Sequence, residues 1–193
     1  MSHLVPLKRL DERAAATLLA QVLLALGYLH DFVGFCHRDI KPDNVLIDAR
    51  GQPKLADFGL ARALPLVLLD QSKPAARETF YSPMGTVEYM PVEIVRAATP
   101  YTRVCDFWCV GVLMFEMLAG EMPFSLQGGS KRKLKQSILA HGTLLDHWPS
   151  HVPLSAAARD LLQRLIAEPQ QRYSNVYAVL SHPWFAQVQL DDF

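Results

Sequence analysis

The first regular pattern of apolar residues in the chain follows Asp11. Apolar side chains recur there at helical spacing, at Leu18, Leu19, Val22, Leu23, Leu26 and Leu29. The pattern stops at the break between Phe32 and Gly34, and aspartate is a favoured residue for capping the first turn of a helix. We therefore predict a helix that begins at Asp11 and leads into the segment after Gly34.

Two short segments, Val-Leu-Ile at residues 45–47 and Lys-Leu-Ala at residues 54–56, flank six residues that include a glycine and a proline. Short segments on either side of such turn residues predict a β-hairpin. The hairpin would place Asn44 and Asp57 at its two open ends.

The rest of the chain is predicted to be mostly helical. Residues 60–101 lack periodicity and are rich in proline, alanine, serine and threonine, which indicates a long loop. Residues 105–118 are apolar on nearly every side, which is typical of a helix buried all round. Three amphipathic helices are expected over residues 131–141, 155–167 and 173–180, the first capped by Ser130. The predicted fold is one mainly α domain around a buried central helix, with a small β-hairpin.

Composition fits a folded domain with balanced charge. Half of the 193 residues are hydrophobic, and 19 lysines and arginines balance 19 aspartates and glutamates. No global basic field points to nucleic acid or to a membrane surface, so we expect no nucleic-acid partner. Three cysteines without metal-ligand spacing favour buried thiols in a reducing compartment, and hence the cytoplasm or the nucleus.

The longest stretch without charge, residues 14–30, is shorter than a membrane span and contains polar positions. The first residues lack the basic start, apolar run and cleavage site of a secretory signal. We expect no membrane-spanning helix.

Candidate chemistry is concentrated in residues 37–44, His-Arg-Asp-Ile-Lys-Pro-Asp-Asn, and in Asp57-Phe58-Gly59, thirteen residues after Asn44. Together they supply a carboxylate base, a lysine for phosphate and oxygen ligands for Mg²⁺, the groups that phosphoryl transfer requires. Taken singly, the aspartates would be interpreted as solvated loop carboxylates, and Phe58-Gly59 as an ordinary turn. The combined pattern of five fixed residues and a spaced Asp-Phe-Gly is too specific for that interpretation.

The combination resembles the catalytic and metal-binding loops of eukaryotic-type serine/threonine protein kinases. The resemblance implies that Asp39 accepts the hydroxyl proton, that Lys41 contacts the transferred phosphate, and that Asn44 and Asp57 hold Mg²⁺. ATP and Mg²⁺ would be the cofactors and a protein serine or threonine the acceptor. The nucleotide would be bound by Lys41, Asp43, Asn44, Leu46 and Asp57, with Leu46 under the adenine.

Further motifs extend the resemblance to nearly the whole chain, as the large C-terminal lobe (C-lobe) of a kinase. Residues 85–93 resemble the end of an activation segment that starts at Asp57, and Thr86 would face the catalytic base and shape the acceptor site. Asp106 would bind the catalytic-loop backbone, and Glu93 would form a buried ion pair with Arg172. The motifs are most similar to the AGC group, with calcium/calmodulin-type kinases next.

The activation segment suggests one regulatory site. Ser82 matches the position at which the AGC group is phosphorylated by an upstream kinase, with Arg38 as its cationic partner. An ordinary Ser-Pro turn is an equally good interpretation. The apolar stripe Leu64, Leu66, Val67, Leu68 and Leu69 would dock on the domain or on a partner.

Two departures separate the chain from the family pattern. Residues 91–93 read Pro-Val-Glu where the family has Ala-Pro-Glu. The 193 residues also contain no Gly-x-Gly-x-x-Gly loop and no Val-Ala-Ile-Lys lysine, so we predict a C-lobe over residues 1–193 without the N-terminal lobe (N-lobe) that covers ATP. Such a chain would not phosphorylate efficiently alone. The alternatives are a non-catalytic interaction module and a truncated gene model; the sequence predicts no oligomeric state.

Overall fold

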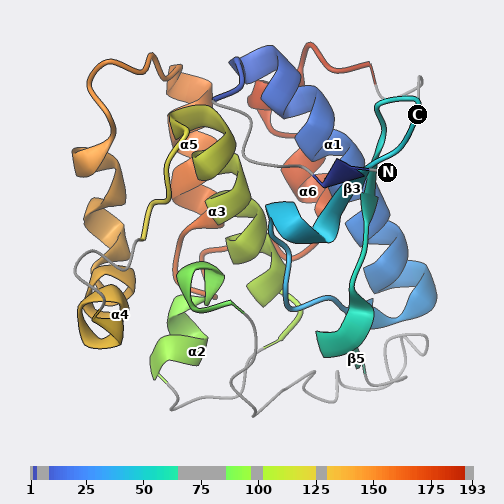
Figure 1. Cartoon of the computed structure of the whole chain (residues 1–193), viewed down its shortest axis with the longest axis horizontal. Helices are drawn as coiled ribbons and strands as arrows, with labels where there is room; N and C mark the ends of the chain where they lie inside the picture. The colour runs from blue at the N-terminus through green and yellow to red at the C-terminus, as the bar shows by residue number, and fades with distance from the viewer. Residues whose placement is uncertain (1, 4–8, 65–85, 97–101, 125–129, 190–193) are drawn as a thin grey trace.

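The structure of the chain is a computed structural model that describes residues 2–3, 9–64, 86–96, 102–124 and 130–189. Its described part is mostly helical (Figure 1), built on two long helices, α1 (Glu12–Tyr28) and α3 (Cys105–Ala119). Shorter helices complete the fold: α2 (Val92–Arg96), α4 (Lys131–Leu139), α5 (Ala156–Leu165) and α6 (Val176–Leu180). The predicted mainly helical fold is confirmed.

Helix α1 forms where the apolar spacing predicts it. Asp11 caps it by accepting the Ala14 N–H at 2.8 Å, and the leucine face, including Leu19 and Leu23, is buried in the core. A π-helical turn, η1 (Leu29–Val33), extends α1, and Gly34 ends it in the left-handed conformation that glycine adopts without strain. By length and composition α1 with η1 is apolar enough to cross a membrane, as core helices can be. In this structure its leucine face is part of the core.

Helix α3 is the buried centre of the domain. Phe107, Trp108 and Leu113 are completely buried, and Gly120 ends the helix with a left-handed conformation. Gly111 lets α5 approach closely, because a Cβ at this position would lie 2.8 Å from side-chain atoms of Leu165 and Ile166. The predicted central helix is therefore confirmed.

The predicted hairpin is confirmed as strands β3 (Val45–Ile47) and β4 (Pro53–Leu55), with Val45 opposite Leu55. The Asp48 carboxylate closes the turn by accepting the N–H groups of Arg50 and Gln52.

The hairpin is part of a larger sheet than the sequence predicted. Strand β1 (Ser2–His3) adds a third, antiparallel strand beside β3. A second small sheet pairs β2 (Phe35–Cys36) with β5 (Arg62–Ala63). Strands of two residues carry no alternation that a sequence could reveal.

Within the residues that the structure describes, the prediction of a continuous loop over residues 60–101 is wrong. Strand β5, the 3₁₀ turn η5 (Val87–Tyr89) and helix α2 interrupt it. Of the apolar stripe, Leu64 is buried, while residues 66–69 and Ser82 lie outside the described residues.

The three predicted C-terminal helices exist but are shorter than predicted. Helix α6 starts at Val176, because Asn175 caps it by accepting the Ala178 N–H at 2.9 Å. Helix α4 is capped by Ser130, as predicted, and is followed by a 3₁₀ segment, η7 (His141–His147). The last regular element of the described residues is the 3₁₀ turn η8 (Pro183–Phe185).

Candidate active site

The candidate catalytic loop is held in place by Asp106, which is buried at the start of α3. Its Oδ1 accepts the Arg38 N–H at 2.7 Å, and its Oδ2 accepts the His37 N–H at 2.9 Å and lies 2.8 Å from His30 Nε2. Burial would raise the pKa of Asp106, but His30 and the two backbone N–H groups outweigh it and lower the pKa below its ordinary 3.8. The predicted contact between Asp106 and the catalytic-loop backbone is confirmed, and His30 is a partner that the sequence did not reveal.

His37 and Arg38 join the catalytic loop to the Asp-Phe-Gly segment. His37 Nε2 lies 3.1 Å from the Ala56 carbonyl, and its ring lies 5.3 Å from that of Phe58, centre to centre. Arg38 has a left-handed backbone and donates its Nε–H to the Leu60 carbonyl at 2.7 Å. Both residues are buried, so the two loops form one packed unit.

Asp39, Lys41 and Thr86 form a compact polar cluster. Lys41 Nζ donates to Asp39 Oδ2 at 2.8 Å and to Thr86 Oγ1 at 2.7 Å. Thr86 donates its N–H and its hydroxyl to Asp39 Oδ1, at 3.1 and 3.0 Å. Burial works to raise the pKa of Asp39, but Lys41 and Thr86 together lower it below 3.8. Three predicted site residues, two from the catalytic loop and one more than 40 positions later, are thus in direct contact around an ionised carboxylate.

Asn44 and Asp57 lie at the open end of the hairpin, as predicted. Asn44 uses its amide nitrogen to bond Asp39, at 2.8 Å to the backbone oxygen and 2.9 Å to Oδ2, so its amide oxygen is directed elsewhere. The Asn44 carbonyl accepts the N–H of Ala56, the neighbour of Asp57, at 2.9 Å. Asp57 is exposed, has a left-handed backbone and accepts the Gly59 N–H. An amide oxygen and an exposed carboxylate fit the oxygen ligands that Mg²⁺ prefers.

Asp43 and Leu46, the other predicted nucleotide-binding residues, lie on either side of Asn44. Asp43 is exposed on the 3₁₀ turn η2 (Pro42–Asn44), and its charge contributes to the raised pKa of Glu116, which burial mainly causes. Leu46 is half-buried in β3. The Glu116 carboxylate also accepts a hydrogen bond from the Tyr89 hydroxyl.

The predicted ion pair of Glu93 and Arg172 is confirmed. Arg172 binds both carboxylate oxygens of Glu93, at 2.8 and 3.0 Å, and both side chains are buried. The guanidinium also donates to the Ala167 and Val104 carbonyls and lies over the Trp108 ring. This pair fixes helix α2 to the C-terminal half of the domain.

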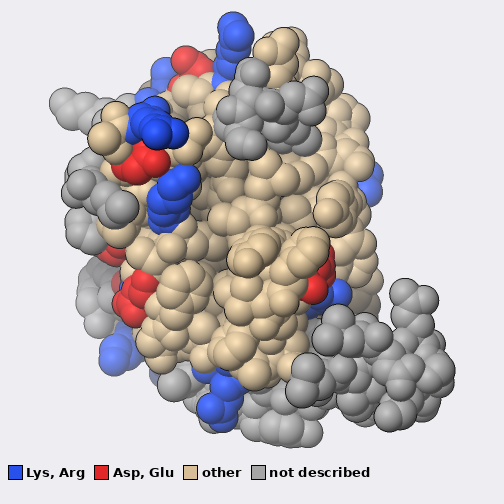
Figure 2. Space-filling view, turned by 90° about the vertical axis from the view of Figure 1, so that its right-hand side faces the viewer, with Lys and Arg blue, Asp and Glu red and all other residues tan. Residues whose placement is uncertain are grey.

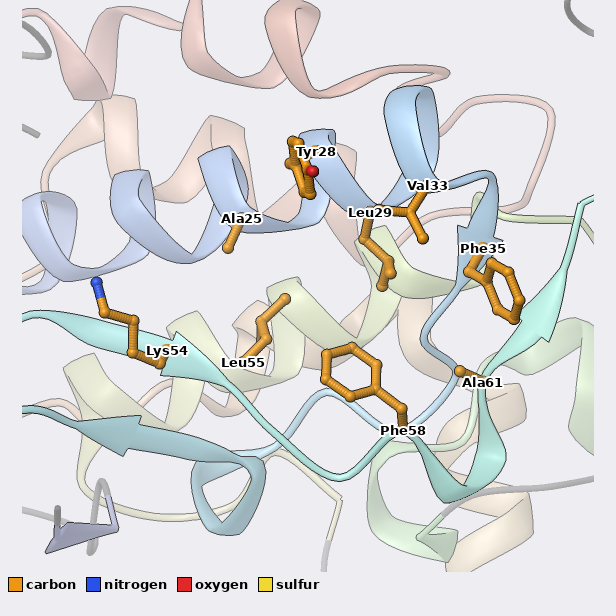
Figure 3. A pocket seen from close by; sticks show the side chains of 9 residues that line it. All are labelled: Ala25, Tyr28, Leu29, Val33, Phe35, Lys54, Leu55, Phe58 and Ala61. Carbon is orange, nitrogen blue, oxygen red and sulfur yellow. The ribbon is translucent and has the colours of Figure 1, made fainter.

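An apolar cavity of about 590 Å³ opens beside the Asp-Phe-Gly segment (Figure 3). Its lining is Ala25, Tyr28, Leu29, Val33, Phe35, Lys54, Leu55, Phe58 and Ala61. Figure 2 faces the right-hand side of Figure 1, where the centre of the surface carries few charged side chains. Phe58 contacts His37 but remains 51% exposed in this cavity, and Tyr28 is 63% exposed. So much exposed aromatic surface is unusual on a monomeric domain.

Comparison with known proteins agrees with the geometry. A family model described as "Protein kinase domain" matches residues 1–185. The cAMP-dependent protein kinase catalytic subunit of Arthrobotrys oligospora is 36% identical over 94% of this chain and 32% of its own length. Serine/threonine-protein kinase sax-1 of Caenorhabditis elegans is 36% identical, over 91% of this chain and 41% of its own. Aurora kinase C of Mus musculus is 35% identical, over 92% of this chain and 57% of its own length. The chain therefore spans between about a third and just over half of these relatives, and it belongs to the protein kinase domain family, among the eukaryotic-type serine/threonine kinases.

Proposed function

We propose that this chain is the catalytic C-lobe of a serine/threonine protein kinase and transfers the terminal phosphoryl group of ATP to a protein hydroxyl. The observation that carries the proposal is the contact of Asp39 with both Lys41 and Thr86, beside Asn44. A base, a cation for phosphate and a metal ligand are thereby gathered at one point, close to the end of the activation segment.

Each of these residues has a task that its surroundings support. Asp39, whose pKa is lowered, is a weak base at neutral pH, so it orients the acceptor hydroxyl and takes its proton as phosphoryl transfer proceeds. Lys41 lies 2.8 Å from Asp39 and can neutralise charge on the transferred phosphoryl group. Thr86, bonded to both, fixes their separation. Bound Mg²⁺, held by Asn44 and Asp57, would neutralise the phosphates of ATP.

The nucleotide site is completed, in this proposal, by an N-lobe that these 193 residues do not include. The support is the absence of a glycine-rich phosphate loop from the sequence together with the exposed cavity beside Phe58. Regulation would act at Ser82 through an upstream kinase, with Arg38 as the cationic partner.

The second candidate function is a non-catalytic interaction module, and the same exposed aromatic surface favours it. Tyr28 lines the cavity and stacks on Phe32, which is 77% exposed. A surface of this kind stabilises association with another protein when it is covered.

Thermal unfolding with and without Mg-ATP tests the proposal. We expect Mg-ATP to raise the melting temperature of the wild-type chain and of an Asp160→Asn control, and to leave that of Asp57→Asn unchanged. A melting temperature independent of Mg-ATP, combined with concentration-dependent dimerisation, would show the interaction module instead.

The size of the native protein tests the N-lobe. An antibody against residues 131–149 should detect a band well above the 21.6 kDa of this chain in the cells that express it. A band at 21.6 kDa would contradict the proposal that an N-lobe shares the polypeptide.

A further inference from the structure

Two of the three cysteines meet directly beneath the candidate catalytic loop. Cys36 ends β2, one residue before His37, and Cys105 begins α3, one residue before Asp106. Their sulfur atoms lie 3.6 Å apart, and the two side chains are 0% and 1% exposed. Both are free thiols in this structure.

The backbones on either side of this contact are already fixed. Asp106 binds the N–H groups of His37 and Arg38, the two residues that follow Cys36. A disulfide joins sulfurs about 2.05 Å apart, so the two sulfurs need to approach by roughly 1.5 Å. The third thiol is directed elsewhere, since Cys109 Sγ donates to the Tyr89 carbonyl at 3.5 Å.

We propose that Cys36 and Cys105 are a site of oxidative modification and form a reversible disulfide. With hydrogen peroxide as oxidant, the two S–H bonds and the O–O bond break, and one S–S bond and two O–H bonds form. The thiols lose two electrons, the peroxide gains them, and the protons leave in two molecules of water. A dithiol reductant reverses the reaction by thiol–disulfide exchange.

Burial determines when the reaction occurs. Leu64 and Ile94 pack with the two cysteines in a small buried cluster, separate from the main core. Burial also raises the pKa of Cys36, which keeps the thiol protonated and slow to react. Oxidation therefore follows local opening of this cluster rather than global unfolding. The cluster is formed by β2, the residue after β5, α2 and the start of α3.

The disulfide would enclose every predicted site residue in one covalent loop. Residues 37–104 lie between the two cysteines and include Asp39, Lys41, Asn44, Asp57 and Thr86. The bond would add a covalent link next to the hydrogen bonds between Asp106 and the catalytic loop. It would replace the weak hydrogen bond that Cys36 Sγ donates to Asp106 at 3.2 Å. A bond that closes so long a loop restricts the unfolded chain strongly.

The test is peroxide treatment of the native chain, followed by blocking of free thiols and mass spectrometry without reductant. We expect loss of two hydrogens, a peptide pair linked through Cys36 and Cys105, and a melting temperature raised by about 5 °C or more. Dithiothreitol should reverse all three changes. The matched control, Cys109→Ala, should behave as the wild type, whereas Cys105→Ala should lose the linked peptide and the shift.

The wild-type chain decides the question even if Cys105→Ala does not fold. Sulfinic acid on separate cysteines, a link through Cys109 or a link between two chains would overturn the proposal. So would a wild-type chain whose thiols remain unlinked at a peroxide concentration that oxidises methionines of the same chain.

Discussion

The Asp106 carboxylate accepts the backbone N–H of Arg38 at 2.7 Å, across 68 positions of the sequence. It holds the neighbouring His37 N–H in the same way, so one buried side chain of α3 positions the segment that carries Asp39. The loop therefore depends on a negative charge in the core for its shape.

We expect Asp106→Asn to destabilise the chain by about 3 kcal/mol or more, because an amide places a donor where the carboxylate accepts several hydrogen bonds. Urea denaturation measures the loss. The exposed carboxylate of Asp160 is a matched control, and Asp160→Asn should cost less than about 1 kcal/mol. Similar losses for both variants would show that Asp106 does not organise the loop.

The acid stability of the chain should reflect the same residue. Because the pKa of Asp106 is lowered on folding, its contribution is fully present above its ordinary value of 3.8 and is lost as the pH falls through the lowered value. Denaturation midpoints measured between pH 7 and pH 2 should fall below about pH 4 in the wild type. The fall should be smaller in Asp106→Asn, and parallel curves for the two proteins would contradict this assignment.

Thr86 should control the ionisation of Asp39. Thr86→Val removes the hydroxyl that donates to Asp39 Oδ1, so the pKa of Asp39 should rise toward 3.8, and stability at neutral pH should fall by about 1 kcal/mol. Carbon-13 NMR of the Asp39 carboxylate follows the titration directly. Thr86→Ser retains the hydroxyl and should leave the pKa unchanged; a shift in this variant as large as in Thr86→Val would refute the role of the hydroxyl.

The ion pair of Glu93 and Arg172 should be worth far more than an exposed one. Glu93→Gln leaves the buried Arg172 charge without its partner, and we expect a loss of about 3–5 kcal/mol in urea denaturation. The exposed pair of Arg96 and Glu168 provides the comparison, and Arg96→Gln should cost less than about 1 kcal/mol. Equal costs would mean that burial does not set the strength of the pair.

Gly111 should tolerate no side chain. A Cβ there would meet Leu165 and Ile166 at 2.8 Å, so Gly111→Ala should force α3 and α5 apart and cost about 1–3 kcal/mol. A Cβ added at Gly142 would meet no other atom within 4 Å, so Gly142→Ala should change the free energy of unfolding by less than about 0.5 kcal/mol. An unchanged midpoint for Gly111→Ala would show that the two helices can separate freely.

Sequence patterns predicted the features of the fold that repeat or that follow a motif. Helix α1 follows from apolar periodicity, and the central helix α3 follows from a run that is apolar on nearly every side. The contacts of Asp106 and of Glu93 follow from the resemblance to kinases. The strands β1, β2 and β5 could not be predicted, since pairs of residues carry no period. The contacts of His30 with Asp106 and of Cys36 with Cys105 depend on how η1 and β2 pack against α3, which no local pattern records.

The hairpin of β3 and β4 also offers a practical advantage for experiments. Its open end carries Asn44 and leads to Asp57, while its turn, with Gly51 in a left-handed conformation, lies at the other end of both strands, where Ala49 and Arg50 are exposed. A fluorescent label attached through Arg50→Cys would therefore move with the strands that join the turn to the candidate metal ligands, without touching those ligands. Such a label would serve as a rigid reporter for following the two loops in solution.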